Sequence, residues 1–171
     1  MPTALRRPLF LLALLTVAAC HRTPATTTVI LVRHAERPPG TDPDLNAAGR
    51  ARAESLAVSL ARSNVSAILH TQFKRAQQTA APLATRLGVV AEVVAATGTE
   101  AQHAQAVVQR VQGLVGQTIL YVGHSNTVPA VIQALGIAPP PAIADTEYQH
   151  FFVVTRVGNG PATLVRVRYG Q

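Results

Sequence analysis

Continuous apolar runs alternate with helical apolar stripes along the chain, a pattern typical of α/β proteins. Strands covered on both faces carry mostly apolar residues, which predicts buried strands at residues 28–32, 67–69, 89–94 and 118–122, although Glu92 interrupts the third of these runs. Stripes of apolar residues three and four apart predict helices after each run. A last pair, 151–154 and 162–167, flanks the hairpin signal Gly158-Asn159-Gly160. The order favours a three-layer α/β/α domain with a mostly parallel sheet and a C-terminal hairpin.

Single residues predict some helix boundaries. Asn46 has the residue type and the position of an N-cap. Gly88 and Gly116 follow the last residues of two apolar stripes, so we expect helices to end there. Pro82 lies inside the predicted helix 74–87 and should kink or break it.

The first nineteen residues have the order of an export signal. Arg6-Arg7 precede an apolar run at 9–15 and then small residues before Cys20, the pattern of a bacterial lipoprotein. An ordinary secretory signal or an uncleaved anchor is the alternative, although the run is short for a bilayer. We predict a signal peptide at 1–19, a tether at 20–27 with lipid on Cys20, and one domain at 28–171. The domain would be exported and anchored to a bacterial membrane, in the periplasm or otherwise outside the cytoplasmic membrane.

Composition narrows the function classes. A chain of 171 residues with 48% hydrophobic content is long enough for one domain with its own core. Cys20 is the only cysteine, so the domain can use neither an internal disulfide nor a thiol nucleophile. The formal net charge of +7 falls to +5 once Arg6 and Arg7 leave with the signal. Because the basic residues are scattered and aromatics make up only 4%, we expect no nucleic-acid partner and favour anionic substrates.

Three polar motifs follow three of the apolar runs. Arg33-His34 comes directly after 28–32, Arg75 lies shortly after 67–69, and Gly123-His124-Ser125-Asn126 follows 118–122. In an open parallel sheet the carboxyl ends of the strands meet at one edge, where ligands bind. The sequence therefore predicts one pocket that contains two arginines and two histidines.

These motifs resemble those of the histidine phosphatase superfamily, which has the phosphoglycerate mutase-like fold, from about Thr26 to the end of the chain. The resemblance implies a phosphatase that forms a phosphohistidine on His34, with Arg33, Arg75 and His124 clamping the phosphoryl group. The residue types suit these roles. Guanidinium groups bind phosphate oxygens in a fork, and a neutral imidazole is nucleophilic near neutral pH. The backbone N–H groups of Ser125 and Asn126, at a predicted helix start, can face the same anion.

The substrate expected from this resemblance is a phosphorylated small molecule or a phosphoprotein, with a phosphomonoester or phosphoramidate bond. Mutase members of the family are larger and carry inserted segments, which argues against mutase activity here. We expect no cofactor, and no metal because no histidine or cysteine pair has zinc-type spacing. The remaining histidines are predicted to be structural: His21, His70, His103 and His150. The alternative function is a non-catalytic lipoprotein that binds a phosphorylated ligand in the same pocket.

The sequence does not identify the general acid that protonates the leaving group, because Glu100 fits two roles, the general acid and part of a helix cap. In one branch of the family an aspartate follows the second histidine, but this chain has Ser125 there. The other branch takes the acid from the middle of the chain, where Glu100 is the only carboxylate within 93–144. Yet Thr97 and Glu100 also have the spacing of a capping box, in which Glu100 would only accept from a backbone N–H group. Three further carboxylates are alternatives for the acid: Glu36, which can instead pair with a neighbouring arginine, Asp145 and Glu147.

Overall fold

The structure, a computed structural model, describes residues 23–170. The predicted signal peptide, the lipidation site at Cys20 and His21 lie outside the described residues, so the anchor and the exported location stay predictions. Within 23–170, no helix is both long enough and apolar enough to cross a membrane.

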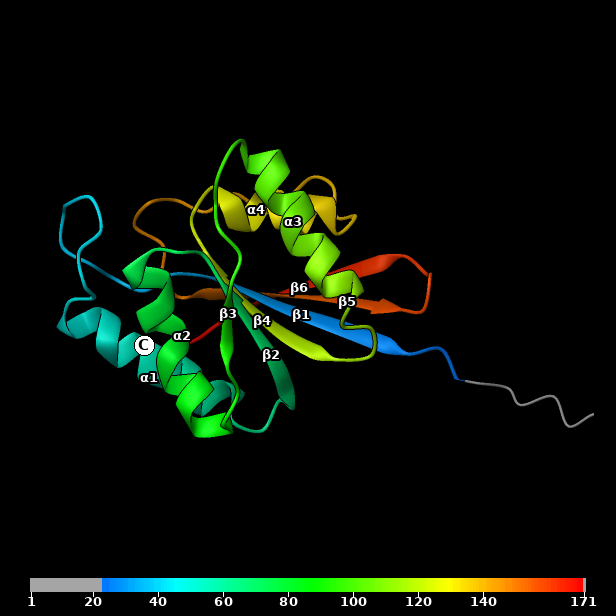
Figure 1. The fold of residues 1–171 in the computed structure, drawn as a ribbon, viewed down its shortest axis with the longest axis horizontal. Coiled ribbons are helices and arrows are strands. Elements are labelled where there is room, and N and C mark those ends of the chain that lie inside the picture. The colour runs from blue at the N-terminus through cyan, green and yellow to red at the C-terminus, as the bar shows by residue number, and fades with distance from the viewer. Residues whose placement is uncertain (1–22, 171) are drawn as a thin grey trace, which may run out of the picture.

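Strands and helices alternate in the predicted order (Figure 1). Their bounds are β1 Thr26–Arg33, α1 Ala47–Leu60, β2 Val65–His70, α2 Lys74–Leu87, β3 Ala91–Val93, α3 Glu100–Gln112, β4 Thr118–Gly123, α4 Thr127–Ala134, β5 His150–Val157 and β6 Ala162–Arg168. In this part of the chain the strands form one sheet in the order β3-β2-β4-β1-β5-β6. β1 to β4 are parallel, whereas β5 and β6 form an antiparallel hairpin beside β1. The predicted fold class is confirmed.

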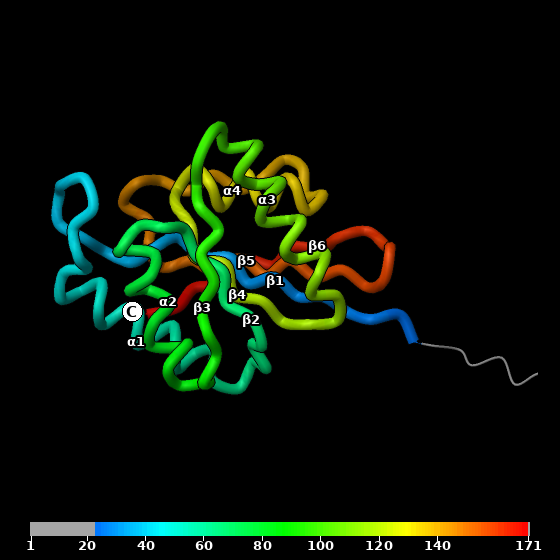
Figure 2. Tube along the Cα trace, in the orientation of Figure 1, coloured from blue at the N-terminus to red at the C-terminus, as the bar shows by residue number. Residues whose placement is uncertain are grey.

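Different helix pairs cover the two faces of the sheet, α1 with α2 on one side and α3 with α4 on the other (Figure 1). Alternate strand residues enter the two cores, because side chains of a strand point to opposite faces. Ile30 and Leu120 pack toward α1 and α2, while Leu31 and Tyr121 pack toward α3 and α4. The described chain enters the sheet at the N-terminal end of β1, and its C-terminal end lies beside α1 (Figure 2).

Two predicted boundaries are wrong, and a break expected inside a helix does not occur. β3 is shorter than 89–94 because the N–H of Val89 donates to Ala84 O and closes the end of α2 instead of joining the sheet. α3 ends at Gly113, not Gly116, and the following residues form turns. α2 is one continuous helix across Pro82, so no break occurs there. Asn46 and Gly88 cap their helices as predicted.

The predicted capping box of Thr97 and Glu100 is also wrong. The box lies two residues later, where Thr99 Oγ1 accepts from Gln102 N (3.2 Å) and Gln102 Oε1 accepts from Thr99 N (2.8 Å). Gly98 has a φ of 72°, which turns the chain so that Thr99 is the last extended residue before α3. Glu100 is the first residue of the helix, and its side chain takes no part in the cap.

Candidate active site

The strand register brings the predicted motifs together. β1 and β4 are parallel neighbours with Arg33 opposite Gly123, and β2 ends beside them at His70. The backbone hydrogen bonds of the sheet continue one residue further. The first residues beyond the three strands therefore lie at one edge: His34, Thr71 and His124.

A cavity of about 380 Å³ opens at this edge. Every residue predicted for the site, apart from the lipidation site, lines it: Arg33, His34, Arg75, Glu100, His124, Ser125 and Asn126. A concave site with several converging polar groups is the usual form of a small-ligand pocket. The structure therefore brings the residues predicted for the site together at one cavity.

Asp145, one of the alternatives for the acid, also lines the cavity, as do four residues that the sequence did not point to: Arg37, Phe73, His103 and Thr127. Of these, His103 was expected to be only structural, yet it is both buried and at the cavity wall. One signal was available in the sequence. His103 lies four residues before Val107, so it shares the buried stripe of α3 one turn closer to the sheet edge.

His34 is buried and fixed in one orientation. Its Nδ1 lies 2.8 Å from the carbonyl oxygen of Ala35, which can only accept, so Nδ1 carries the proton and Nε2 keeps the lone pair. Burial lowers the pKa of His34 to about 4, and the nearby charges of Arg33 and Arg75 act in the same direction. The imidazole is therefore neutral at neutral pH.

His124 packs against the first histidine. The two rings are 5.2 Å apart in an edge-to-face arrangement, and Phe73 makes a similar contact from another side. Its Nε2 lies 2.9 Å from Thr71 Oγ1, whereas Nδ1 is buried with no hydrogen-bond partner within residues 23–170. Burial, followed by the charge of His34, lowers the pKa of His124 to about 3. This ring is also neutral at neutral pH.

Arg33 is buried and Arg75 is half-buried, and each has part of its guanidinium group tied to the protein. Arg33 Nη1 donates to Ala144 O (2.9 Å), and its guanidinium lies 4.2 Å from the ring centre of Tyr148. Arg75 Nη1 donates to Asp42 Oδ1 (3.3 Å), and its guanidinium covers Phe73. In each arginine Nε is buried without an acceptor among the described residues. Buried N–H groups without acceptors are unfavourable. Both arginines line the cavity, where their positive charge favours an anion.

Two carboxylates flank the start of α4 at the cavity. Glu100 Oε1 accepts from Asn126 Nδ2 (2.7 Å), and Asp145 Oδ1 accepts from Ser125 Oγ (3.0 Å). Both acids line the cavity. The other two candidate acids do not line it: Glu147 faces Arg166 and the Ala144 N–H, and Glu36 faces Arg52.

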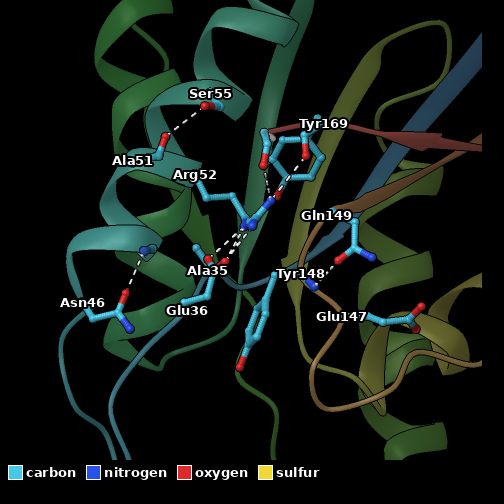
Figure 3. A network of polar contacts seen from close by, with 12 residues as sticks. Ala35, Glu36, Asn46, Ala51, Arg52, Ser55, Glu147, Tyr148, Gln149 and Tyr169 are labelled. Atoms are coloured by element: carbon cyan, nitrogen blue, oxygen red, sulfur yellow. Dashed lines mark hydrogen bonds and ion pairs between the residues drawn. The ribbon is translucent and has the colours of Figure 1, made fainter.

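Behind the cavity, an ion pair holds the segment that follows His34 (Figure 3). Arg52 of α1 donates from Nε and Nη2 to both oxygens of Glu36 at 2.7–2.9 Å, as expected for a pairing with a neighbouring arginine. Its Nη1 donates to the carbonyl oxygens of Tyr169 and Gly170. A side chain at Gly49 would collide with the Glu36 carbonyl, so α1 starts in direct contact with this segment. The exit of β1, α1 and the C-terminal end are thus joined.

We expect Arg52→Ala to lower the free energy of unfolding by about 2–3 kcal/mol at pH 7, because half-buried Glu36 loses its charged hydrogen-bond donors. Although burial alone raises it, hydrogen bonds from Arg52 lower the pKa of Glu36 below its usual value. A carboxyl group whose pKa is lower in the folded than in the unfolded state stabilises the fold at any pH above its unfolded-state pKa. This stabilisation is lost as the pH falls through the folded-state pKa. Urea unfolding should therefore show the difference shrinking below about pH 4. Exposed Arg62→Ala is the control, and equal stabilities of Arg52→Ala and wild type at pH 7 would contradict the assignment.

Residues 29–98 match the family model described as "Histidine phosphatase superfamily (branch 1)". This stretch of the chain is similar to the histidine phosphatase superfamily. The matched stretch includes Arg33, His34 and Arg75 and ends before His124. None of the curated protein sequences matches the chain.

Solved structures share the fold of this chain at low identity. The protein histidine phosphatase SixA complexed with tungstate is 19% identical, with a TM-score of 0.66, and the alignment covers 82% of this chain and 96% of that one. A mycobacterial glucosyl-3-phosphoglycerate phosphatase is 16% identical (TM-score 0.66, 81% and 97% covered). Phosphoglycerate mutase from Bacillus anthracis is 12% identical (TM-score 0.65, 85% and 94% covered). These matches show a phosphoglycerate mutase-like fold.

Proposed function

We propose that this protein is a phosphatase that hydrolyses phosphomonoesters or phosphoramidates through a phosphohistidine on His34. The observation that carries the proposal is a neutral imidazole, oriented by the Ala35 carbonyl, beside buried arginine N–H groups that lack acceptors. Such a pocket combines a nucleophile with fixed positive charge, which phosphoryl transfer requires.

The reaction would proceed in two displacements at phosphorus. First, the Nε2 lone pair of His34 attacks phosphorus while the bond to the leaving oxygen or nitrogen breaks, and the leaving atom takes a proton from an acid. Then water attacks the phosphohistidine and gives a proton to the conjugate base of that acid, the phosphorus–nitrogen bond breaks, and phosphate leaves with Nε2 and the acid restored. The guanidinium groups of Arg33 and Arg75 would stabilise the charge on the equatorial oxygens. His124, with Nε2 bound to Thr71, has Nδ1 left for the same group.

The nature of the structural relatives supports a phosphorylated substrate. One is named as a protein histidine phosphatase with bound tungstate, a tetrahedral oxyanion, and another as a glucosyl-3-phosphoglycerate phosphatase. A phosphorylated small molecule and a phosphoprotein both fit a cavity that is open to solvent. A protein that only bound such a ligand would need the arginines but not a neutral nucleophile, so we favour the enzyme over the binding lipoprotein.

The direct experiment is phosphate release by the purified protein from a panel that contains p-nitrophenyl phosphate, phosphoserine and a phosphohistidine peptide. We expect turnover of at least one of them. If the folded protein binds inorganic phosphate but turns over no member of the panel, the binding function replaces the enzyme.

The nucleophile should stay active at a pH where an ordinary histidine is protonated. Because burial lowers the pKa of His34 to about 4, the lone pair on Nε2 is retained down to that pH and lost below it. We therefore expect an NMR titration of the His34 imidazole to have its midpoint near pH 4, well below the usual value of about 6.5. A midpoint near the usual value would mean that the ring is more solvated than the structure has it.

A further inference from the structure

A line of buried polar groups connects α3 with the second histidine of the cavity. His103 Nε2 lies 2.7 Å from Tyr121 Oη, which lies 3.1 Å from Thr127 Oγ1. Thr127 Oγ1 in turn accepts from the backbone N–H of His124 (2.9 Å). All four residues are at most 8% exposed. We call the linked side chains of His103, Tyr121 and Thr127 the hydroxyl chain.

Only one arrangement of hydrogens satisfies the whole hydroxyl chain. His103 Nδ1 lies 3.1 Å from the carbonyl oxygen of Ala95, so Nδ1 carries the proton and Nε2 accepts. Tyr121 then donates to His103, and Thr127 donates to Tyr121, which leaves the Thr127 oxygen to accept from the His124 N–H group. Burial lowers the pKa of His103 and raises that of Tyr121, so both keep these forms at neutral pH. Every hydrogen bond therefore has a fixed direction.

The local sequence makes room for this arrangement. A side chain at Gly123 would place its Cβ 2.7 Å from both Tyr121 Oη and Thr127 Oγ1. The contact from Thr127 to the N–H of His124, three residues earlier, has the form of half a capping box. The N–H of Val128 donates to His124 O (3.0 Å), so both backbone groups of His124 are fixed.

We propose that Thr127, Tyr121 and His103 are positioning residues of the phosphatase reaction, which orient the His124 imidazole through its backbone. The inference rests on the proposed function of the site. The ring of His124 has one hydrogen bond of its own, to Thr71, so its direction toward His34 and the phosphoryl group also depends on where its backbone is held. Small displacements of a catalytic group can cost large factors in rate.

The test removes one hydroxyl without changing shape. In Thr127→Val the His124 N–H group loses its acceptor, so we expect kcat for p-nitrophenyl phosphate to fall about tenfold, which corresponds to about 1.4 kcal/mol. KM should change less than twofold, because the ground state is held by the arginines. Hydrogen exchange of the His124 amide should become at least about tenfold faster. Thr127→Ser keeps the hydroxyl and should restore wild-type values.

A matched control is Tyr169→Phe, since Tyr169 is also a buried tyrosine but its hydroxyl has no partner within residues 23–170. It should leave kcat and the His124 amide unchanged, whereas Tyr121→Phe should lower kcat. The double variant Tyr121→Phe/Thr127→Val should be no slower than Thr127→Val, because both act through one chain.

Unchanged kcat in folded Thr127→Val, with unfolding measured in parallel, would overturn the inference. The inference would also be overturned if the kcat of the double variant fell by the product of the factors lost in Tyr121→Phe and Thr127→Val, because independent effects multiply. If the wild type turned over no substrate, the proposed function would fail, and the hydroxyl chain would be judged on its own by NMR. Altered His124 imidazole ¹⁵N shifts in Thr127→Val would then support the positioning role, and unchanged shifts would overturn it.

Discussion

His34→Ala should abolish the covalent intermediate and lower turnover by more than about 10³-fold, because no other group in the cavity combines a fixed lone pair with this position. Wild-type protein quenched during turnover of ³²P-labelled substrate should carry a label that is stable in base and lost in acid, as a phosphorus–nitrogen bond is. The variant should carry none. His150→Gln, which removes a buried histidine that does not line the cavity, should keep both the label and the rate.

The alternatives give different results in the same experiment. Wild-type turnover by folded His34→Ala would exclude a covalent mechanism at this residue. A label that persists in His34→Ala and disappears in His124→Ala would move the nucleophile to the second histidine. A rate that falls only because the variant unfolds is recognised by circular dichroism at the assay temperature.

The core of the fold could be predicted because burial on both faces leaves a signal in every strand residue. Runs such as 28–32 and 118–122 contain no charged residue, and the structure buries Val29–Val32 and Ile119–Val122 in the middle of the sheet. Once those strands are parallel neighbours, the residues after them must share an edge. This is why His34 and His124 could be predicted to meet although they are 90 positions apart.

The contacts that tune the site could not be predicted in this way. Arg33 is held by Ala144 and Tyr148, in a loop whose path no periodicity defines. His103 reaches the cavity only because α3 packs against α4, a tertiary contact. The capping box was misplaced because Thr97 and Thr99 offer overlapping patterns, and the positive φ of Gly98 selects the second.

The observed position of the capping box bears most on the general acid. Glu100 is free of the helix cap, lines the cavity and accepts from Asn126. We therefore expect Glu100→Gln to slow esters of poor leaving groups by about 10²–10⁴-fold, because glutamine cannot donate the proton that the leaving oxygen needs. Acidic phenols leave as phenolates without that proton, so the hydrolysis of their esters should not slow. The melting temperature should not change, since Thr99 and Gln102 form the box without Glu100.

Asp145→Asn is the matched variant for this experiment, because Asp145 also lines the cavity and is held by Ser125 across the start of α4. Rates should be compared on p-nitrophenyl phosphate and an alkyl phosphate, which differ mainly in how much the leaving oxygen needs a proton. Selective loss on the alkyl ester in Glu100→Gln alone assigns the acid to Glu100. Selective loss in Asp145→Asn alone assigns it to Asp145. Glu36 and Glu147 are no longer candidates, because neither lines the cavity and they are held by Arg52 and Arg166. If both variants hydrolyse both esters at the wild-type rate, water rather than a carboxyl group protonates the leaving oxygen.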